Sequence, residues 1–434
     1  MANYEIKGGY KLKGSISTRF AKNAALPALY SSLMVKGVSS FTNVPRIQEV
    51  FRTIEVLKSM GVKIGWKGDH DLELNTTGKI DISSLNRESA EKTRAVIYMI
   101  GTMIHSQKNF DIPYMGGCKL GRRTIAAHLF GLEPLGVGVE TLNRKYRITR
   151  KNSLKGQEIV MYESGDTATV QLLFAACMAT GKTKIRMASA NYMVQYACNL
   201  LNKMGAKITG IGTTDIEITG VKKLKPARKY PIMHDPIESM FFISLAATTN
   251  SSITIKQCPY DFIMLELLKL KEMGFNYQIL KRYKSTCGGF DLVDIKTLPS
   301  KLKAAPDKLY GRPYPGLNID NLPFFVPIAT QAKGQTLIHD WVYENRAIYY
   351  MDFNNLGANI ILADPHRVYI NGPTKLKPAE VICSPVLRTA TSMVIGMLAA
   401  KGTSILRNTY QINRGYEDLF ERLKKLGAKI RMVD

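Results

Sequence analysis

The segment 114–128, YMGGCKLGRRTIAAH, combines a thiol with glycines and cations. Cys118 follows two glycines, and Lys119, Arg122 and Arg123 come directly after it. Positive charges beside a cysteine stabilise the thiolate and lower the thiol pKa, which makes the group a nucleophile and an exchangeable proton donor. The same residues also fit a flexible surface loop with an incidental thiol. The segment by itself leaves both interpretations open.

Metal and disulfide chemistry find no support in the sequence. The six cysteines and six histidines are scattered, with no CxxC pair and no HxxxH spacing. This distribution favours reduced thiols and argues against a disulfide scaffold and against a zinc site. We therefore predict neither a metal nor a cofactor.

The chain is strongly basic, with 60 Lys and Arg against 35 Asp and Glu and a formal net charge of +25. Such a charge suits either a nucleic acid or small, multiply charged anions. The basic residues run along the whole chain instead of gathering in a tail or an aromatic-basic motif. The charge alone does not decide between the two partners.

Targeting and membrane signals are also missing from the sequence. The first residues, MANYEIKGGYKLKG, contain no apolar signal region. The most apolar runs, such as SMVIGMLAA (392–400), are far shorter than the roughly 20 residues of a membrane span. We expect a cytoplasmic protein that does not contact a membrane.

The elements that must position the reactive residues are organised as a repeat. A leucine-spaced amphipathic segment ends at a glycine and continues as a short alternating strand, as in LNKMGAKIT and LKKLGAKIR. Six such glycines recur at roughly 70-residue spacing, namely Gly61, Gly136, Gly205, Gly274, Gly357 and Gly427. Glycine at this place is able to take the left-handed conformation that ends a helix.

The repeat predicts an α/β fold of six units, each with two helices alternating with strands. Grouped three and three, the units would form two similar domains with a cleft between them. A crossover is expected at KYPIMHDP (229–236), which is rich in proline and turn residues. An open solenoid is disfavoured because common solenoid repeats are shorter.

Seven short motifs, in their order and at their distances, resemble the enolpyruvyl transferases. Within that group they most resemble the UDP-N-acetylglucosamine 1-carboxyvinyltransferase (MurA) family, over essentially the whole chain. The motifs are AKNAALP (21–27), KTRA (92–95), GGCKLGRR (116–123), PYPGLNID (313–320), ENR (344–346), LR (387–388) and INRGYE (412–417). The sister enzyme that makes enolpyruvylshikimate phosphate has another N-terminal motif and lacks the cysteine loop.

The resemblance implies six βαβαββ-type repeats, arranged as two inside-out α/β barrels. Its domains would be residues 21–231, with the Cys118 loop, and residues 1–20 plus 232–434. The implied reaction moves the enolpyruvyl group of phosphoenolpyruvate to a hydroxyl of a nucleotide or nucleotide-sugar acceptor and releases phosphate. The vinyl carbon gains a proton and the acceptor hydroxyl loses one.

The resemblance also implies roles for individual residues. Cys118, Asp320 and Lys22 would be catalytic: the thiol as proton donor and nucleophile, and Asp320 as the acceptor of the hydroxyl proton. Asp320 also suits a structural role as a helix N-cap. The implied phosphoenolpyruvate-binding residues are Lys22, Arg94, Arg123, Arg388 and Arg414. The implied acceptor-binding residues are Asn23, Thr124, Asp166, Asp320, Tyr343 and Arg346, with Glu344 and Asn345 beside them.

The sequence departs from the family pattern mainly on the acceptor side. After Arg123 the family continues Pro-x-Asp-x-His, and this chain has Thr124 and Ala126 at the Pro and Asp positions. The family's Ser-Val-Gly aligns with Gly165-Asp166-Thr167, which places a carboxylate where acceptor phosphates would lie. The remaining departures are Phe20 for Gly, Asn191 and Met193 for two glutamates, and Val386 for the Asp of Asp-Leu-Arg.

These departures leave the acceptor open. UDP-N-acetylglucosamine, held through compensating contacts, is one candidate, in peptidoglycan biosynthesis. Another nucleotide such as UMP, as in nucleoside-antibiotic pathways, is the second. An RNA 3′-phosphate cyclase of the same repeat fold would suit the charge, but the histidines lie in no matching context. A non-catalytic binding protein is the remaining alternative, favoured by Val386 and opposed by Cys118.

Overall fold

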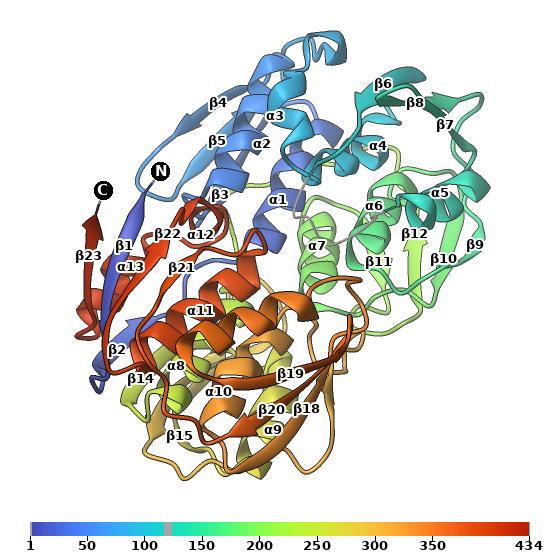
Figure 1. The fold of residues 1–434 in the computed structure, drawn as a ribbon. Helices are drawn as coiled ribbons and strands as arrows, with labels where there is room; N and C mark the ends of the chain where they lie inside the picture. The colour runs from blue at the N-terminus through green and yellow to red at the C-terminus, as the bar shows by residue number, and fades with distance from the viewer. Residues whose placement is uncertain (1, 117–123, 434) are drawn as a thin grey trace.

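The computed structural model describes residues 2–116 and 124–433, and these residues form two lobes (Figure 1). Within the described residues the strands form six sheets, three in each lobe. The fold is of the α/β class that the sequence predicts, and a cavity opens between elements of the two lobes. The domain boundaries at residues 20 and 231, and the description as repeated barrels, remain predictions.

The first lobe contains sheets of four, three and four strands. In spatial order they are β13 (Tyr230–Pro231), β3 (Val38–Thr42), β5 (Leu72–Asn75), β4 (Lys63–Trp66); β6 (Asn109–Pro113), β8 (Lys145–Arg150), β7 (Val137–Leu142); and β11 (Lys207–Thr209), β12 (Ile216–Thr219), β10 (Lys182–Arg186), β9 (Glu158–Val160). Its helices are α1 (Lys22–Ser31), α2 (Gln48–Ser59), α3 (Arg87–Glu91), α4 (Tyr98–Met103), α5 (Ala126–Leu132), α6 (Asp166–Ala176) and α7 (Tyr192–Lys203).

The second lobe contains three four-stranded sheets. In spatial order they are β15 (Asn276–Lys284), β16 (Asp291–Leu298), β14 (Ser252–Pro259), β2 (Lys13–Ser17); β17 (Leu309–Tyr310), β18 (Gly334–His339), β20 (Arg367–Gly372), β19 (Asn359–Asp364); and β21 (Glu380–Ile382), β22 (Gly402–Arg407), β1 (Asn3–Gly8), β23 (Lys429–Val433). Its helices are α8 (Pro236–Thr248), α9 (Met264–Glu272), α10 (Phe325–Gln331), α11 (Leu387–Ala399), α12 (Tyr410–Asn413) and α13 (Leu419–Lys425).

Short 3-10 helices complete the elements. They are η1 (Ser32–Met34), η2 (Ile82–Ser84), η3 (Ala95–Ile97), η4 (Glu133–Leu135), η5 (Tyr260–Phe262), η6 (Leu322–Phe324) and η7 (Ala347–Leu356). Two of the six helices that the repeat predicts before a glycine are of this type, η4 and η7. All six glycines have the predicted left-handed φ, between +77° at Gly357 and +101° at Gly205, and a strand begins one or two residues after each.

Buried helices form the centre of each lobe. Every residue of α8 is buried, and α11 is buried over Leu387–Leu398. A helix that is apolar on all sides needs a protein environment around its whole circumference. In the second lobe α8, α10 and α11 pack together with the sheets around them (Figure 1).

The chain crosses between the lobes twice. The N-terminal strand β1 pairs with β22 and β23, and β2 pairs with β14, so residues 3–17 complete sheets of the second lobe. In the other direction β13 pairs with β3 of the first lobe. Phe20 and His234 form an isolated antiparallel bridge between the two crossing segments.

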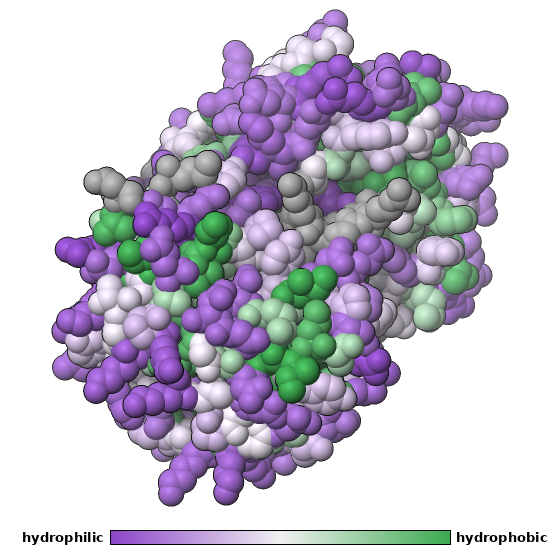
Figure 2. All heavy atoms as spheres, in the orientation of Figure 1, coloured by the Kyte–Doolittle hydropathy of each residue, from purple (hydrophilic) through white to green (hydrophobic). Residues whose placement is uncertain are grey.

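The visible surface is mostly polar. Hydrophilic side chains cover most of the face in Figure 2, with smaller hydrophobic patches among them. No helix among the described residues has the length and apolar character to span a bilayer.

Candidate active site

A cavity of about 750 Å³ brings together the described candidate residues from both lobes. Most of the predicted site residues that the structure describes line it: Lys22, Asn23, Arg94, Thr124, Asp166, Asp320, Tyr343, Glu344, Arg346, Arg388 and Arg414; Asn345 does not. Cys118 and Arg123 lie outside the described residues. The cavity therefore collects residues that are up to several hundred positions apart in the chain.

Helix α1 presents the first two candidates at its N-terminus. Lys22 is its first residue, and the first turn contains no acidic side chain. The backbone N–H groups at a helix start and a lysine ammonium both favour an anion. Asn23 donates to the Tyr192 hydroxyl of α7 at 2.9 Å, which fixes the amide beside the lysine.

Glu49 of α2 ties two of the predicted cations together. Arg414 donates to Glu49 Oε1 through Nε at 3.1 Å and also through Nη2, and Thr93 donates to Oε2 at 2.8 Å. Burial by itself would raise the pKa of Glu49, but the charges of Lys22 and Arg414 and these hydrogen bonds outweigh it and lower the pKa. The carboxylate stays ionised and holds the Arg414 guanidinium in place.

A second network surrounds Asp320. Its carboxylate lies 3.6 Å from Arg388 Nη2 and 3.8 Å from Arg346 Nη1. Arg346, only 1% exposed, is held by Asp340, which accepts from its Nε at 2.6 Å and from its Nη2 at 2.9 Å. The Tyr350 hydroxyl donates to the same Asp340 carboxylate at 2.6 Å. Two guanidinium groups thus lie beside the carboxylate that the family resemblance assigns to proton removal.

Carboxylates remain around Arg388 although Val386 replaces the family's Asp. Arg388 donates to the Tyr416 hydroxyl at 3.0 Å and approaches Asp320, and Asp235, the N-cap of α8, also interacts with it. Burial raises the pKa of Asp235 to about 6, and the charge of Arg388 offsets part of that rise. Arg388 therefore has carboxylate neighbours from other elements although position 386 carries a valine.

A third network surrounds Asp166, the first residue of α6, which the family resemblance assigns to the acceptor side. Its carboxylate accepts from Ser189 Oγ at 2.5 Å and from Asn191 Nδ2 at 2.8 Å. Burial raises the pKa of Asp166, the two hydrogen bonds lower it, and the charge of Asp320 raises it further, with a net rise. By the family resemblance, Asn191 stands in place of a glutamate and Asp166 stands in place of a valine. Since Asn191 contacts Asp166, the carboxylate is lost at position 191 and gained at position 166.

Arg94 and Thr124 lie together at the edge of the cavity. Arg94 Nη2 donates to the Thr124 carbonyl at 2.9 Å, and Thr124 Oγ1 accepts from the Ala126 N–H at the start of α5. The side chain of Thr124 is exposed. Arg94 thus contacts the backbone that follows the Cys118 segment. Its predicted role toward phosphoenolpyruvate remains a prediction.

Several residues of the site were missed by the sequence reasoning, among them Glu49, Asp235 and Asp340. Glu49 carried a usable signal, because it falls on the same buried face of α2 as Thr53 and Val56. A carboxylate on an otherwise buried helical face needs partners. Asp340 had no such signal, since its arginine partner is six residues away in an irregular segment.

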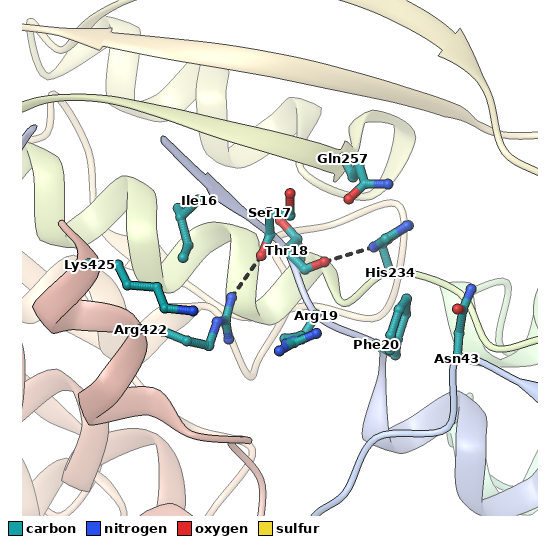
Figure 3. A pocket seen from close by; sticks show the side chains of 10 residues that line it. All are labelled: Ile16, Ser17, Thr18, Arg19, Phe20, Asn43, His234, Gln257, Arg422 and Lys425. Atoms are coloured by element: carbon teal, nitrogen blue, oxygen red, sulfur yellow. Dashed lines mark hydrogen bonds between the residues drawn. The ribbon is translucent and has the colours of Figure 1, made fainter. Parts of the chain in front are cut away.

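A second cavity, of about 320 Å³, lies at the two chain crossings (Figure 3). Arg422 donates to the Ser17 carbonyl at 2.7 Å and also pairs with Glu238, and His234 Nδ1 lies 2.8 Å from the Thr18 carbonyl oxygen. Phe20, a departure from the family's Gly, lines this cavity. It holds none of the predicted site residues, so the larger cavity is the candidate active site. Within the described residues, no three His, Cys, Asp or Glu side chains cluster in a way that would hold a metal ion.

Comparisons with known proteins agree over the full chain. A family model described as EPSP synthase (3-phosphoshikimate 1-carboxyvinyltransferase) matches residues 6–423. The UDP-N-acetylglucosamine 1-carboxyvinyltransferase of Treponema denticola is 34% identical over 443 residues, with 100% of both chains covered. The enzyme of the same name from Borreliella burgdorferi is 32% identical over 440 residues, covering 100% of this chain and 99% of the relative.

Solved structures show the same fold. The enolpyruvyl transferase NikO from Streptomyces tendae has a TM-score of 0.86 at 20% identity, covering 100% of this chain and 99% of its own. EPSP synthase from Acinetobacter baumannii has a TM-score of 0.79 at 20% identity, with 100% of both chains covered. At this identity the likeness speaks for the fold alone.

Proposed function

We propose, since the chain belongs to the EPSP synthase (3-phosphoshikimate 1-carboxyvinyltransferase) family, that it transfers the enolpyruvyl group of phosphoenolpyruvate to a hydroxyl of UDP-N-acetylglucosamine and releases phosphate. The observation that carries the proposal is the convergence of Lys22, Arg388 and Arg414 on one cavity with Asp320. Three cations suit a donor with a phosphate and a carboxylate. The chain is thus an enzyme of the carboxyvinyl transferase type.

The donor would be held by Lys22, Arg414 and Arg388, with Arg123 and Arg94 assisting. Glu49 neutralises part of this positive charge and fixes the direction of the Arg414 guanidinium. A guanidinium held in place by a buried partner needs little reorganisation when a dianionic ligand arrives. The described cations therefore form a site prepared for phosphate and carboxylate.

The proposed chemistry is an addition followed by an elimination. The acceptor hydroxyl loses its proton to Asp320 and its oxygen bonds to carbon two of phosphoenolpyruvate, while carbon three takes a proton from Cys118. The Cys118 thiolate then takes a proton from carbon three, the bond between carbon two and the phosphate oxygen breaks, and phosphate leaves as the double bond forms again. Arg346 and Arg388 place positive charge beside the Asp320 carboxylate.

A second acceptor is favoured by one observation on the acceptor side. Asp166 is a partly buried carboxylate in the cavity, and the residues Pro and Asp of the family loop are absent at positions 124 and 126. A carboxylate repels phosphate groups, so a smaller nucleotide such as UMP, placed differently, is the alternative. NikO, whose fold this chain shares, is named as an enolpyruvyl transferase.

Phosphate release from phosphoenolpyruvate tests the proposal directly. The purified protein is offered UDP-N-acetylglucosamine, UMP and other nucleotides in separate reactions, with mass spectrometry of each product. Turnover with the amino-sugar nucleotide supports the main proposal, and turnover with UMP alone supports the alternative. If no phosphate were released with any of the acceptors, both proposals would be contradicted.

A further inference from the structure

One tryptophan lies exposed on the wall of the active-site cavity. The chain has two tryptophans, Trp66 and Trp341, and of these Trp341 lines the cavity. Its side chain is 49% exposed, although it follows β18 at the base of a well-packed sheet. A large aromatic ring left half exposed on a cavity wall lacks the packing partners it would have in a core.

The indole ring is held in one orientation. Its Nε1 donates to the Gly311 carbonyl at 2.8 Å. Gly311 is itself tightly packed, because a Cβ atom there would lie 2.6 Å from the Ile319 side chain. The ring is therefore a fixed flat surface, built on the backbone next to Asp320.

The residue after Gly311 places a positively charged side chain on the cavity wall. Arg312 follows Gly311, is exposed, and also lines the cavity. Its backbone N–H donates to the Leu317 carbonyl at 2.9 Å, and its guanidinium lies 5.2 Å from the centre of the Tyr310 ring. The hydrogen bond from Trp341 to Gly311, the residue before Arg312, brings the indole and Arg312 to the same part of the cavity wall.

A flat aromatic surface next to a guanidinium is the chemistry that recognises a base joined to phosphate. Aromatic rings stack on any nucleobase, and one guanidinium group is able to donate two parallel hydrogen bonds to two oxygens of a phosphate. Both features come from residues 311–341 of the second lobe, not from the loop of the first lobe where the family's Pro and Asp are missing.

We propose that Trp341 and Arg312 form the nucleotide-binding part of the acceptor site: the base stacks on Trp341 and a phosphate pairs with Arg312. The proposal rests on the proposed function, because it takes the acceptor to be a nucleotide. It places the acceptor's base and phosphate on the part of the cavity wall that residues 311–341 of the second lobe contribute.

Tryptophan fluorescence tests the stacking without any need for turnover. In the W66F variant Trp341 is the sole tryptophan, and in W341F the sole one is Trp66, whose ring packs against Arg46 and Phe51. We expect UMP and UDP-N-acetylglucosamine to quench W66F and to leave W341F unchanged. Ribose 5-phosphate, which has no base, should quench neither. Quenching of W341F alone, or of neither variant, would overturn the proposal.

Steady-state kinetics tests the same residues in the full enzyme. We expect W341A to raise the KM for the nucleotide acceptor by roughly 10- to 100-fold, with the KM for phosphoenolpyruvate unchanged. R312A should raise the acceptor KM, and R312K should recover part of the loss. An acceptor KM that W341A leaves unaltered would contradict the proposal. If the wild-type protein released no phosphate while W66F was still quenched by UMP, the proposed function would fail and the nucleotide site would stand.

Discussion

The two halves of the active-site cavity differ in how their side chains are held. On the donor half, Arg388 is 5% exposed and Glu49 and Arg414 are similarly buried, and each has a charged partner. On the side proposed for the acceptor, Thr124, Arg312 and Trp341 are exposed, and Trp341 donates to a backbone carbonyl while Arg312 packs on a ring; Arg346 on that side is buried and paired with Asp340.

This difference fits the departures at Thr124 and Ala126, whereas Val386 and Met193 are departures at buried positions. A buried ion pair loses several kcal/mol when one partner is removed, because the other charge is left unpaired. The donor residues are thus constrained together. An exposed side chain on a loop is constrained only by what it binds. Changes such as Thr124 and Ala126 can therefore accumulate one at a time on the acceptor half.

The largest effect is expected from the loop that should complete the donor half. Cys118→Ala should lower turnover by about 10³-fold or more, because a positioned proton donor typically contributes 10²- to 10⁴-fold, and should end reaction with fosfomycin-like epoxides. Phosphate release and mass spectrometry of the epoxide-treated protein measure the two effects. Cys287→Ala is the control, since burial raises the pKa of that thiol to about 11 and makes it unreactive. Full activity in the Cys118 variant would remove the thiol from the mechanism.

A smaller but still large effect is expected at the centre of the donor half. Glu49→Ala leaves the Arg414 guanidinium and Lys22 without their buried carboxylate, so the free energy of unfolding should fall by about 3 kcal/mol. The KM for phosphoenolpyruvate should also rise. Urea unfolding measures the first effect. Glu55→Ala on the same helix, where the side chain is exposed, should change stability by about 0.5 kcal/mol or less. Equal losses in both variants would contradict a special role for Glu49.

Asp235 offers a pH test of the buried charges. Its pKa rises from the usual 3.8 to about 6 in the folded protein. Between pH 3.8 and about pH 6, Asp235 binds more protons in the folded state than in the unfolded chain. Its contribution to stability therefore falls as the pH rises through this range, and it is lost above about pH 6.

Asp235→Asn removes this titration while keeping a side-chain oxygen for the N-cap of α8. The stability of the variant relative to wild type should therefore increase from pH 4 to pH 7, by up to about 3 kcal/mol. Urea unfolding at several pH values measures the difference, with the exposed Asp307→Asn as control. A difference that does not vary with pH would show that Asp235 titrates alike in both states.

The smallest effect is expected on the acceptor half. Asp166→Asn removes a negative charge while keeping a group able to accept from Ser189, and should lower the KM for UDP-N-acetylglucosamine by several-fold, about 1 kcal/mol. The KM for phosphoenolpyruvate should stay constant. The exposed Asp215→Asn serves as control. A higher acceptor KM in the Asp166 variant would mean that the carboxylate accepts hydrogen bonds from the acceptor.

Most of the residues that the sequence predicts for the site stand in a motif, and Thr124, Asp166 and Tyr343 lie outside the seven motifs. Lys22, Asp320, Arg388 and Arg414 stand in short segments with a recognisable order, and the structure brings them to one cavity. Glu49 and Asp340 were missed because their importance comes from the partner they contact. The proposed nucleotide-binding residues, Trp341 and Arg312, also belong to no shared motif.

The sequence by itself determined the local elements and the chemistry. Each of the six glycines ends a helix in the left-handed conformation, since that depends on neighbouring residues only. Tertiary structure decided which groups meet. Arg414 reaches Glu49 across 365 residues, and β1 completes a sheet with β22 and β23 at the other end of the chain. Such contacts depend on how buried helices and sheets pack, and packing is a property of the whole chain instead of any short segment.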